Sequence, residues 1–260
     1  MKKLGFVVLT VASAFLLSLA SGAVGDSMKP TIVLVHGAFV DGSSWDKVIP
    51  ILQGDGYPVI AVQNPLTSLP DDVATTKRVI DAQEGPVVVV GHSYGGAVIT
   101  AAAAGNPNVK ALVYVAAFAP EPGEPLGSPE KNFAQPALNS AIVPAAAGFL
   151  YIDRTKFHDD FCKDLSAADA SVLAATQKPL NSSVFGASVA SAAWKTIPSW
   201  YIVSSQDQAE NPEAQRFYAK RMGAKTTEIE ASHLSILSHP KEVAKVIEEA
   251  SRAATAALRK

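Results

Sequence analysis

The stretch that decides the fold is Pro86-Val87-Val88-Val89-Val90-Gly91-His92-Ser93-Tyr94-Gly95-Gly96-Ala97. Its four consecutive valines predict a strand that is buried on both faces. An alanine-rich run follows at once and predicts a helix over residues 97–104. Between the two, Gly91 to Gly95 fits the Gly-x-Ser-x-Gly pattern of a sharp strand-to-helix turn that exposes a serine. Ser93 is therefore the candidate nucleophile.

The glycines of this pattern have a steric reason. A serine in such a turn adopts a strained backbone conformation. A side chain two residues away on either side would collide with the adjoining strand or helix. The pattern also arises by chance at ordinary turns, but a strand before it and a helix after it favour a nucleophile. We therefore expect Gly91 and Gly95 to be required at their positions.

Apolar runs and amphipathic stretches alternate along most of the chain. The alternation predicts an α/β fold with a mostly parallel sheet and helices on both faces. The carboxyl ends of parallel strands then meet at one edge of the sheet, where ligands bind. Strands are expected at residues 31–35, 58–62, 87–90, 110–118, 199–205 and 225–230, and helices at 45–53, 73–82, 97–104, 212–222 and 240–258.

The alternation breaks at Ala119. Three prolines within residues 120–125 exclude a regular helix or strand. From there to about Ala193 the sequence is irregular, apart from a helix expected over residues 166–177 with Ser166 as its N-cap. We interpret residues 119–193 as a cap inserted over the site rather than as a separate domain.

The first 23 residues have the pattern of a secretory signal peptide. Two lysines, an apolar run over residues 4–20 and small residues at the end predict a cut after Ala23. An uncleaved membrane anchor is the alternative, although the apolar run is a little short to span a bilayer. We expect an exported protein, periplasmic or secreted, whose residues 24–260 form one domain and keep no stable membrane association after cleavage.

Charge and composition exclude several classes of partner. Without Lys2 and Lys3 the chain has 20 basic residues against 24 acidic ones, a formal net charge of −4. No basic cluster is present to neutralise phosphates, so no nucleic acid is expected as a partner. Cys162 is the single cysteine, which excludes an internal disulfide and favours a small buried apolar residue. No metal-ligand spacing occurs among the histidines and carboxylates.

Ser93 needs a base, and the base needs an orienting group. In folds with this turn the order along the chain is serine, acid, histidine, which excludes His36 and His92. Of the later histidines, His158 lies among charged residues of the predicted cap, and His239 directly precedes the proline that starts the last helix. His233 follows a predicted strand by a short loop and is therefore the expected general base.

The acid is expected to follow a strand between the serine and the histidine. Asp207 is the first carboxylate after the predicted strand at 199–205, and we assign it this role. Glu210 is the alternative. Glu210 and Glu213 lie where a helix begins, and negative charge at a helix N-terminus needs no catalytic explanation.

An oxyanion hole requires two backbone N–H donors. One is expected from Tyr94, directly after the nucleophile, and the other from the loop after the first strand, where Ala38 is the best candidate. His36, in the same loop, is expected to shape it through hydrogen bonds to the backbone.

These motifs together resemble the α/β-hydrolase superfamily, and most closely its small serine esterases related to plant methyl-ester hydrolases and hydroxynitrile lyases. The resemblance runs from residue 31 to about residue 250. It rests on four motifs in the same order: Val35-His36-Gly37-Ala38 with Gly42-Ser43-Ser44-Trp45, Gly91-His92-Ser93-Tyr94-Gly95-Gly96, Ser205-Gln206-Asp207, and Ala231-Ser232-His233.

Two positions bear on the reaction that the resemblance implies. The lyases of this branch commonly have threonine after the strand-end histidine and lysine after the catalytic histidine. This chain has Gly37 and Leu234 there, which leaves room for an ester and water and offers no charge to cyanide. Dehalogenases and epoxide hydrolases of the superfamily place aspartate where this chain has Ser93. The resemblance implies no cofactor and no metal.

The expected function is hydrolysis of a small carboxylic ester through an acyl-enzyme at Ser93. The alternatives are a lyase or carbon–carbon hydrolase that uses the same triad, and a non-catalytic binding protein on this fold. Aromatic residues of the predicted cap hint at an apolar acyl or alcohol group, although their usual role is packing.

Overall fold

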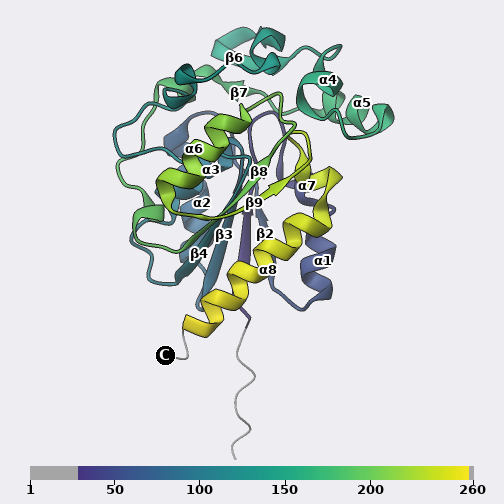
Figure 1. Cartoon of the computed structure of the whole chain (residues 1–260). Helices are drawn as coiled ribbons and strands as arrows, with labels where there is room; N and C mark the ends of the chain where they lie inside the picture. Colours follow the sequence, from purple (N-terminus) through teal and green to yellow (C-terminus); the bar gives the residue numbers. More distant parts are fainter. Residues whose placement is uncertain (1–28, 258–260) are drawn as a thin grey trace, which may run out of the picture.

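The computed structural model describes residues 29–257, so the predicted signal peptide lies outside the described residues. Parallel strands form one six-stranded sheet in the order β2-β1-β3-β4-β8-β9, and the predicted parallel α/β architecture is confirmed (Figure 1). The strands are β1 (Thr31–Val35), β2 (Val59–Val62), β3 (Val87–His92), β4 (Val109–Val115), β8 (Ser199–Ser204) and β9 (Lys225–Ile229).

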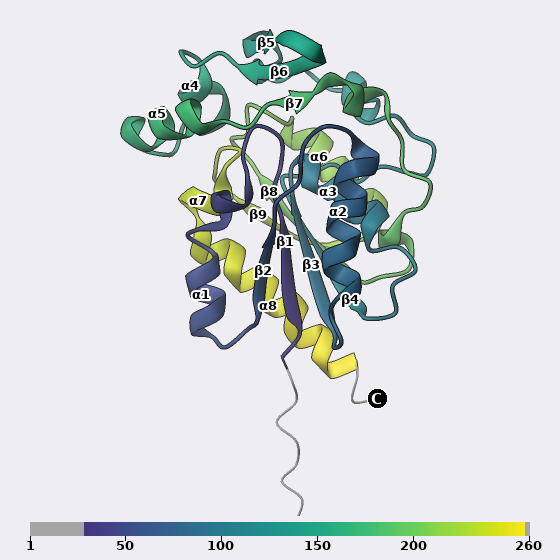
Figure 2. The same ribbon diagram turned by 180° about the vertical axis from the view of Figure 1, so that it is seen from behind.

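Helices cover both faces of the sheet (Figures 1 and 2). One face carries α2 (Leu69–Asp81), α3 (Tyr94–Ala102) and α6 (Pro212–Met222), and the other carries α1 (Ile49–Gly54) and α8 (Pro240–Ala257). The valines of β3 alternate between the two resulting cores, with Val87 and Val89 in one and Val88 and Val90 in the other. All four are fully buried, as the valine run predicts.

The segment between β4 and β8 crosses above the carboxyl ends of the strands (Figure 2). We call residues 119–193 of it the cap segment. It holds a three-stranded antiparallel sheet of β5 (Ile142–Pro144), β6 (Phe149–Ile152) and β7 (Leu180–Asn181), and the helices α4 (Phe157–Phe161) and α5 (Ala167–Thr176). Ser166 caps α5 as predicted, because its Oγ accepts from Asp169 N. The small sheet was not predicted from the sequence, because strands of two to four residues are too short to show an alternation of apolar and polar residues.

Short helical turns complete the described chain. They are α7 (Ser235–Ser238) and the 3-10 helices η1 (Gly42–Trp45), η2 (Pro129–Asn132), η3 (Ala137–Ala141), η4 (Ala146–Gly148), η5 (Ser182–Gly186) and η6 (Ala193–Lys195). Within residues 29–257, no helix combines the length and hydrophobicity needed to cross a membrane. Cys162 is buried as predicted, and burial raises the pKa of its thiol to about 12.

Four predicted boundaries differ from the structure by three residues or more, and one of them is the helix expected at 97–104, which is α3 and begins at Tyr94. The helix expected at 45–53 is split into η1 and α1, because Pro50 has no N–H and fits only the first turn of a helix. The strand expected to reach residue 118 ends at Val115, since Ala116 has a φ of 44° and turns the chain out of the sheet. Helix α2 begins before residue 73, where Ser68 Oγ accepts from Asp71 N and caps it.

Candidate active site

Ser93 is the single residue between β3 and α3. Its backbone has φ 53° and ψ −126°, a combination that costs an L-residue conformational energy. Strand β4 and the loop after it hold Ser93 there, because Ser93 N donates to Val115 O at 3.0 Å and Ser93 O accepts from Phe118 N at 3.2 Å. The strained turn expected from the Gly-x-Ser-x-Gly pattern is therefore present.

Steric contacts explain the flanking glycines. A Cβ on Gly91 would lie 2.6 Å from Gly95 O, and a Cβ on Gly95 would lie 2.5 Å from Val35 O. Both contacts are with backbone atoms, which cannot rotate away. The collision predicted on each side of Ser93 is confirmed, and a Cβ on Gly96 would likewise collide with Phe118 O.

Replacing Gly95 by alanine is therefore expected to destabilise the protein by about 1–3 kcal/mol, the usual cost of an overpacked core. In a domain of this size, each kcal/mol of lost stability should lower the Tm measured by thermal unfolding by about 2–4 °C. Gly54→Ala is the matched control, since its added Cβ would meet nothing within 4 Å. An unchanged Tm for Gly95→Ala would contradict this steric reading of the turn.

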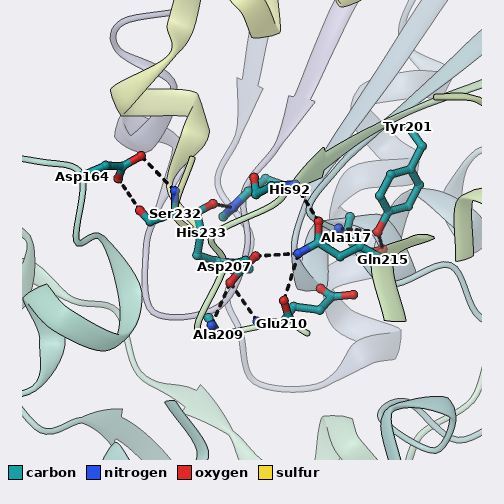
Figure 3. Close-up of polar contacts among 11 residues, drawn as sticks. His92, Ala117, Asp164, Tyr201, Asp207, Ala209, Glu210, Gln215, Ser232 and His233 are labelled. Carbon is teal, nitrogen blue, oxygen red and sulfur yellow. Dashed lines mark hydrogen bonds and ion pairs between the residues drawn. The ribbon is translucent and has the colours of Figure 1, made fainter. Parts of the chain in front are cut away.

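Asp207 and His233 lie at the carboxyl edge of the sheet, in the loops after β8 and β9, and form a direct pair (Figure 3). His233 Nδ1 lies 2.7 Å from Asp207 Oδ2, and both residues are buried. Asp207 Oδ1 accepts from Ala209 N at 2.7 Å and from Glu210 N at 2.9 Å. Every group facing the Asp207 carboxyl is a donor, which suits a carboxylate.

Glu210, the alternative acid, lies elsewhere. Its side chain extends away from Asp207 and His233 (Figure 3), and neither of its carboxyl oxygens bonds to any group in residues 29–257. Glu210 contributes to the Asp207–His233 pair through its backbone N–H, which donates a hydrogen bond to Asp207 Oδ1. The geometry thus favours Asp207 over Glu210 as the partner of His233.

Ser93 and His233 line one cavity of ≈ 210 Å³ between the sheet edge and the cap segment. Among the hydrogen bonds of residues 29–257, none joins Ser93 Oγ to the imidazole. Such contacts are often long in a free enzyme and shorten with substrate bound. The structure brings the two residues to one cavity without closing the contact.

The two backbone donors expected for an oxyanion border the same cavity. Ala38 lies in the loop after β1, and Tyr94 is the first residue of α3. Neither N–H donates to an acceptor within the described part of the chain. The helix dipole also favours negative charge at the N-terminus of a helix, where backbone N–H groups are free to donate.

His36 has the predicted shaping role. Its Nε2 accepts from Asn64 N at 3.0 Å, so its Nδ1 carries the proton and donates to Gly37 O at 2.8 Å. Burial lowers the pKa of His36 to about 4. This neutral histidine ties the loop that carries Ala38 to the end of β2, which confirms the prediction from sequence.

Comparison with known proteins places this arrangement in a family. The model of the alpha/beta hydrolase family matches residues 32–246. This chain belongs to the alpha/beta hydrolase family. Relatives include "Probable hydrolase R7" of Phoma sp., 28% identical with 85% of this chain and 98% of that protein covered. Polyneuridine aldehyde esterase of Rauvolfia serpentina is 26% identical, with 83% and 93% covered.

Solved structures share the fold of this alpha/beta hydrolase. A pyrethroid hydrolase from Sphingobium faniae JZ-2 superposes with a TM-score of 0.72 at 23% identity, covering 86% of this chain and 98% of that one. The predicted superfamily is confirmed, and a plant esterase among the relatives agrees with the predicted branch.

The structure shows what surrounds Gly37 and Leu234, the two positions compared above with the lyases. A Cβ on Gly37 would lie 2.8 Å from Ser93 Cβ and 3.0 Å from His92 Nδ1, so threonine does not fit here without a shift. Leu234 is fully buried in the core and places no charge beside His233. The first position thus has no room for a side chain, and the second carries no charge, as the sequence comparison with the lyases implies.

Two contacts that the sequence did not predict hold the His233 loop. His92 Nε2 donates to His233 O at 3.0 Å, and the two rings lie 4.8 Å apart. From the cap segment, Asp164 accepts from Ser232 N at 2.9 Å and from the Ser232 hydroxyl (Figure 3). These pairs are 141 and 68 residues apart in the chain, so no local signal reveals them.

Gln215 on α6 holds the acid. Its Nε2 donates to Asp207 Oδ2 at 2.7 Å, while its Oε1 accepts from Ser204 N at 2.9 Å (Figure 3). The side chain is fully buried, so its amide is locked between β8 and the carboxylate. Gln215 is thus a positioning residue for Asp207, and sequence analysis missed it.

Gln215→Leu is expected to lower kcat by about 10–100-fold, since a hydrogen bond to a charged group contributes about 1.5–3 kcal/mol. KM should change little, because Gln215 does not line the cavity. Steady-state kinetics with a chromogenic ester measures both quantities. The control is Glu213→Gln, on the exposed face of the same helix. If the two variants had the same kcat, Gln215 would not have the positioning role.

Proposed function

We propose that this chain is a serine hydrolase that cleaves small carboxylic esters through an acyl-enzyme at Ser93. The observation that carries the proposal is the buried Asp207–His233 pair, with 2.7 Å between Oδ2 and Nδ1, on the cavity that Ser93 lines. A base with its orienting carboxylate beside a serine in a strained turn is the arrangement that activates a hydroxyl.

His233 Nε2 takes the proton of Ser93 Oγ as the oxygen attacks the ester carbonyl carbon. Asp207 keeps the imidazole in the tautomer with Nδ1–H and stabilises the imidazolium that forms. The N–H groups of Ala38 and Tyr94 donate to the developing oxyanion, and each such donor lowers the barrier by about 3 kcal/mol. His233 then protonates the leaving alcohol, and water repeats the steps to release the acid.

The family and its named members support this chemistry. The relatives include a polyneuridine aldehyde esterase and a pyrethroid hydrolase, which are named for ester or hydrolytic reactions. The cavity suits a small substrate, with Phe39, Phe118 and Leu138 among its apolar walls.

Pre-steady-state hydrolysis of p-nitrophenyl acetate tests the proposal. We expect a burst of p-nitrophenol stoichiometric with the enzyme, followed by slower turnover as the acyl-enzyme is hydrolysed. Absence of both burst and turnover, with this ester and with larger p-nitrophenyl esters, would contradict the esterase proposal.

We further propose that the protein is exported and cut after Ala23, on the basis of Lys2, Lys3 and the apolar run at 4–20. Intact mass spectrometry of protein from periplasm or culture medium is expected to give a 237-residue chain that begins at Val24. A full-length chain in the soluble cell interior would contradict export. A full-length chain in the membrane fraction would favour an uncleaved anchor.

A further inference from the structure

A side chain of the cap segment packs directly on the proposed general base. Phe161, the last residue of α4, has its ring centre 5.1 Å from that of the His233 imidazole, with 42° between the ring planes. Both residues are 2% exposed, and both line the candidate active-site cavity. Among residues 29–257, the other aromatic ring packed on His233 is that of His92, at 4.8 Å. The imidazole thus contacts one ring from the sheet and one from the cap.

Two further aromatic rings hold the ring of Phe161. Phe157, one turn earlier on α4, lies 5.1 Å from it, and Phe39 lies 6.3 Å from it, edge to face. Edge-to-face packing is a favoured geometry for aromatic pairs, so the Phe161 ring has a defined position. Phe39 directly follows Ala38, the expected oxyanion donor in the loop after β1. One ring of the cap segment therefore contacts both the base and the loop of the expected oxyanion hole.

Asp164, three residues further along the cap segment, holds the residue before His233. Its Oδ2 accepts from Ser232 N at 2.9 Å, and its Oδ1 accepts from the Ser232 hydroxyl (Figure 3). Burial alone would raise the pKa of Asp164, but the hydrogen bonds from Ser232 outweigh burial and lower this pKa, so the group is a carboxylate at neutral pH. Hydrogen bonds to a charged acceptor are the strong ones, so this pair fixes the backbone directly before His233.

The orientation of His233 needs more than its contact with Asp207. That contact fixes Nδ1, at 2.7 Å from Asp207 Oδ2, but the imidazole can still tilt about it and move Nε2 away from Ser93. Rings packed on the imidazole oppose the tilt, and a fixed backbone at Ser232 fixes where the side chain starts. A misplacement of about 1 Å can cost about 100-fold in rate. We therefore expect these cap contacts to affect the chemical step.

We propose that Phe161 and Asp164 are positioning residues for His233, so that the cap segment is part of the catalytic machinery as well as a cover over the cavity. Phe161 holds the imidazole, and Asp164 holds the backbone that carries it. Both belong to residues 161–164, at the end of α4. This assignment rests on the proposed esterase function and adds two residues to its site.

Steady-state kinetics with p-nitrophenyl acetate tests the two contacts separately. Asp164→Ala should lower kcat about tenfold with little change in KM, because Asp164 does not line the cavity. Asp164→Asn keeps an acceptor oxygen for Ser232 N and should recover most of the loss. Phe161→Leu keeps an apolar side chain without the ring and should also lower kcat about tenfold. The controls are Asp159→Ala, exposed on α4, and Phe149→Leu, half-buried on β6. Neither control residue lines the cavity, and both variants should keep the wild-type kcat.

Proton NMR shows whether His233 is the group affected. A histidine Nδ1–H bonded to a carboxylate gives a resonance far downfield of the amide protons, and its loss in Asp207→Ala assigns the signal. In Phe161→Leu and Asp164→Ala this signal should be broadened or absent, because a mobile imidazole exchanges its proton with water faster. In the two control variants it should stay sharp.

Either cap residue loses its assigned role if its variant folds, as judged by circular dichroism, and keeps the wild-type kcat or the sharp His233 signal. An Asp164→Asn variant no more active than Asp164→Ala would contradict the hydrogen-bonding role of Asp164. Should Phe161→Leu not fold, Phe161→Met, with its more adaptable side chain, takes its place. A wild-type protein that hydrolyses no ester would refute the proposed function instead, and the NMR signal would then still decide whether the cap holds His233.

Discussion

Ser93→Ala is expected to lower kcat for p-nitrophenyl acetate by about 10⁴-fold or more and to abolish the burst. Alanine keeps the backbone of the turn but has no hydroxyl, so no acyl-enzyme forms. The backbone donors of Ala38 and Tyr94 remain and account for whatever slow hydrolysis is left. Stopped-flow absorbance for the burst and steady-state assays for kcat measure the effect.

A matched serine separates this effect from a general one. Ser140 is exposed in the cap segment and does not line the cavity, so Ser140→Ala should behave as the wild-type protein. The Tm of Ser93→Ala should stay near that of the wild type, since Ser93 Oγ makes no hydrogen bond within residues 29–257. If Ser93→Ala kept more than a tenth of the wild-type kcat, another group would have to be the nucleophile.

Asp207→Asn is expected to lower kcat by about 10³–10⁴-fold, close to the effect of removing the acid from other triads. Donors surround this carboxyl, from Ala209 N, Glu210 N, Gln215 Nε2 and His233 Nδ1. In the variant, the side-chain NH₂ group, which replaces one carboxylate oxygen of Asp207, must therefore face a donor, with which it cannot form a hydrogen bond while that donor keeps its proton. Where it faces His233, it makes Nδ1 an acceptor and moves the proton to Nε2, so the imidazole no longer accepts a proton from Ser93.

Glu213→Gln makes the same chemical change on an exposed carboxyl of α6 and should leave kcat unaffected. Near-wild-type activity of Asp207→Asn would mean that His233 is oriented by another group. The pH profile gives a second measurement, because a variant with the wrong tautomer should recover part of its activity at high hydroxide concentration.

The features that sequence analysis predicted correctly have local signals. The valine run predicts a buried strand, and the glycines around Ser93 predict a sterically crowded turn. Each of these signals lies within a few consecutive residues. Asp207 and His233 follow two predicted strands, and the parallel sheet brings the ends of its strands to one edge. The division of the helix expected at 45–53 was missed although it too has a local signal, because Pro50 fits only the first turn of a helix.

The features that were missed depend on contacts between distant segments. His92 contacts His233 O, and Asp164 contacts Ser232; both contacts join segments that are far apart in the chain. Gln215 is one of several polar residues on α6, and only the fold shows that it faces Asp207.

The assignment of Ser93 as the nucleophile is tested most directly by locating the covalent adduct of a p-nitrophenyl phosphonate. Trypsin is expected to release residues 79–110, in which Ser93 is the only serine. We predict one phosphonyl group per chain, placed on Ser93 by tandem mass spectrometry, with loss of activity in proportion to labelling. Complete inactivation with the adduct on any other residue, or turnover of esters by a protein that the phosphonate never labels, would contradict the assignment.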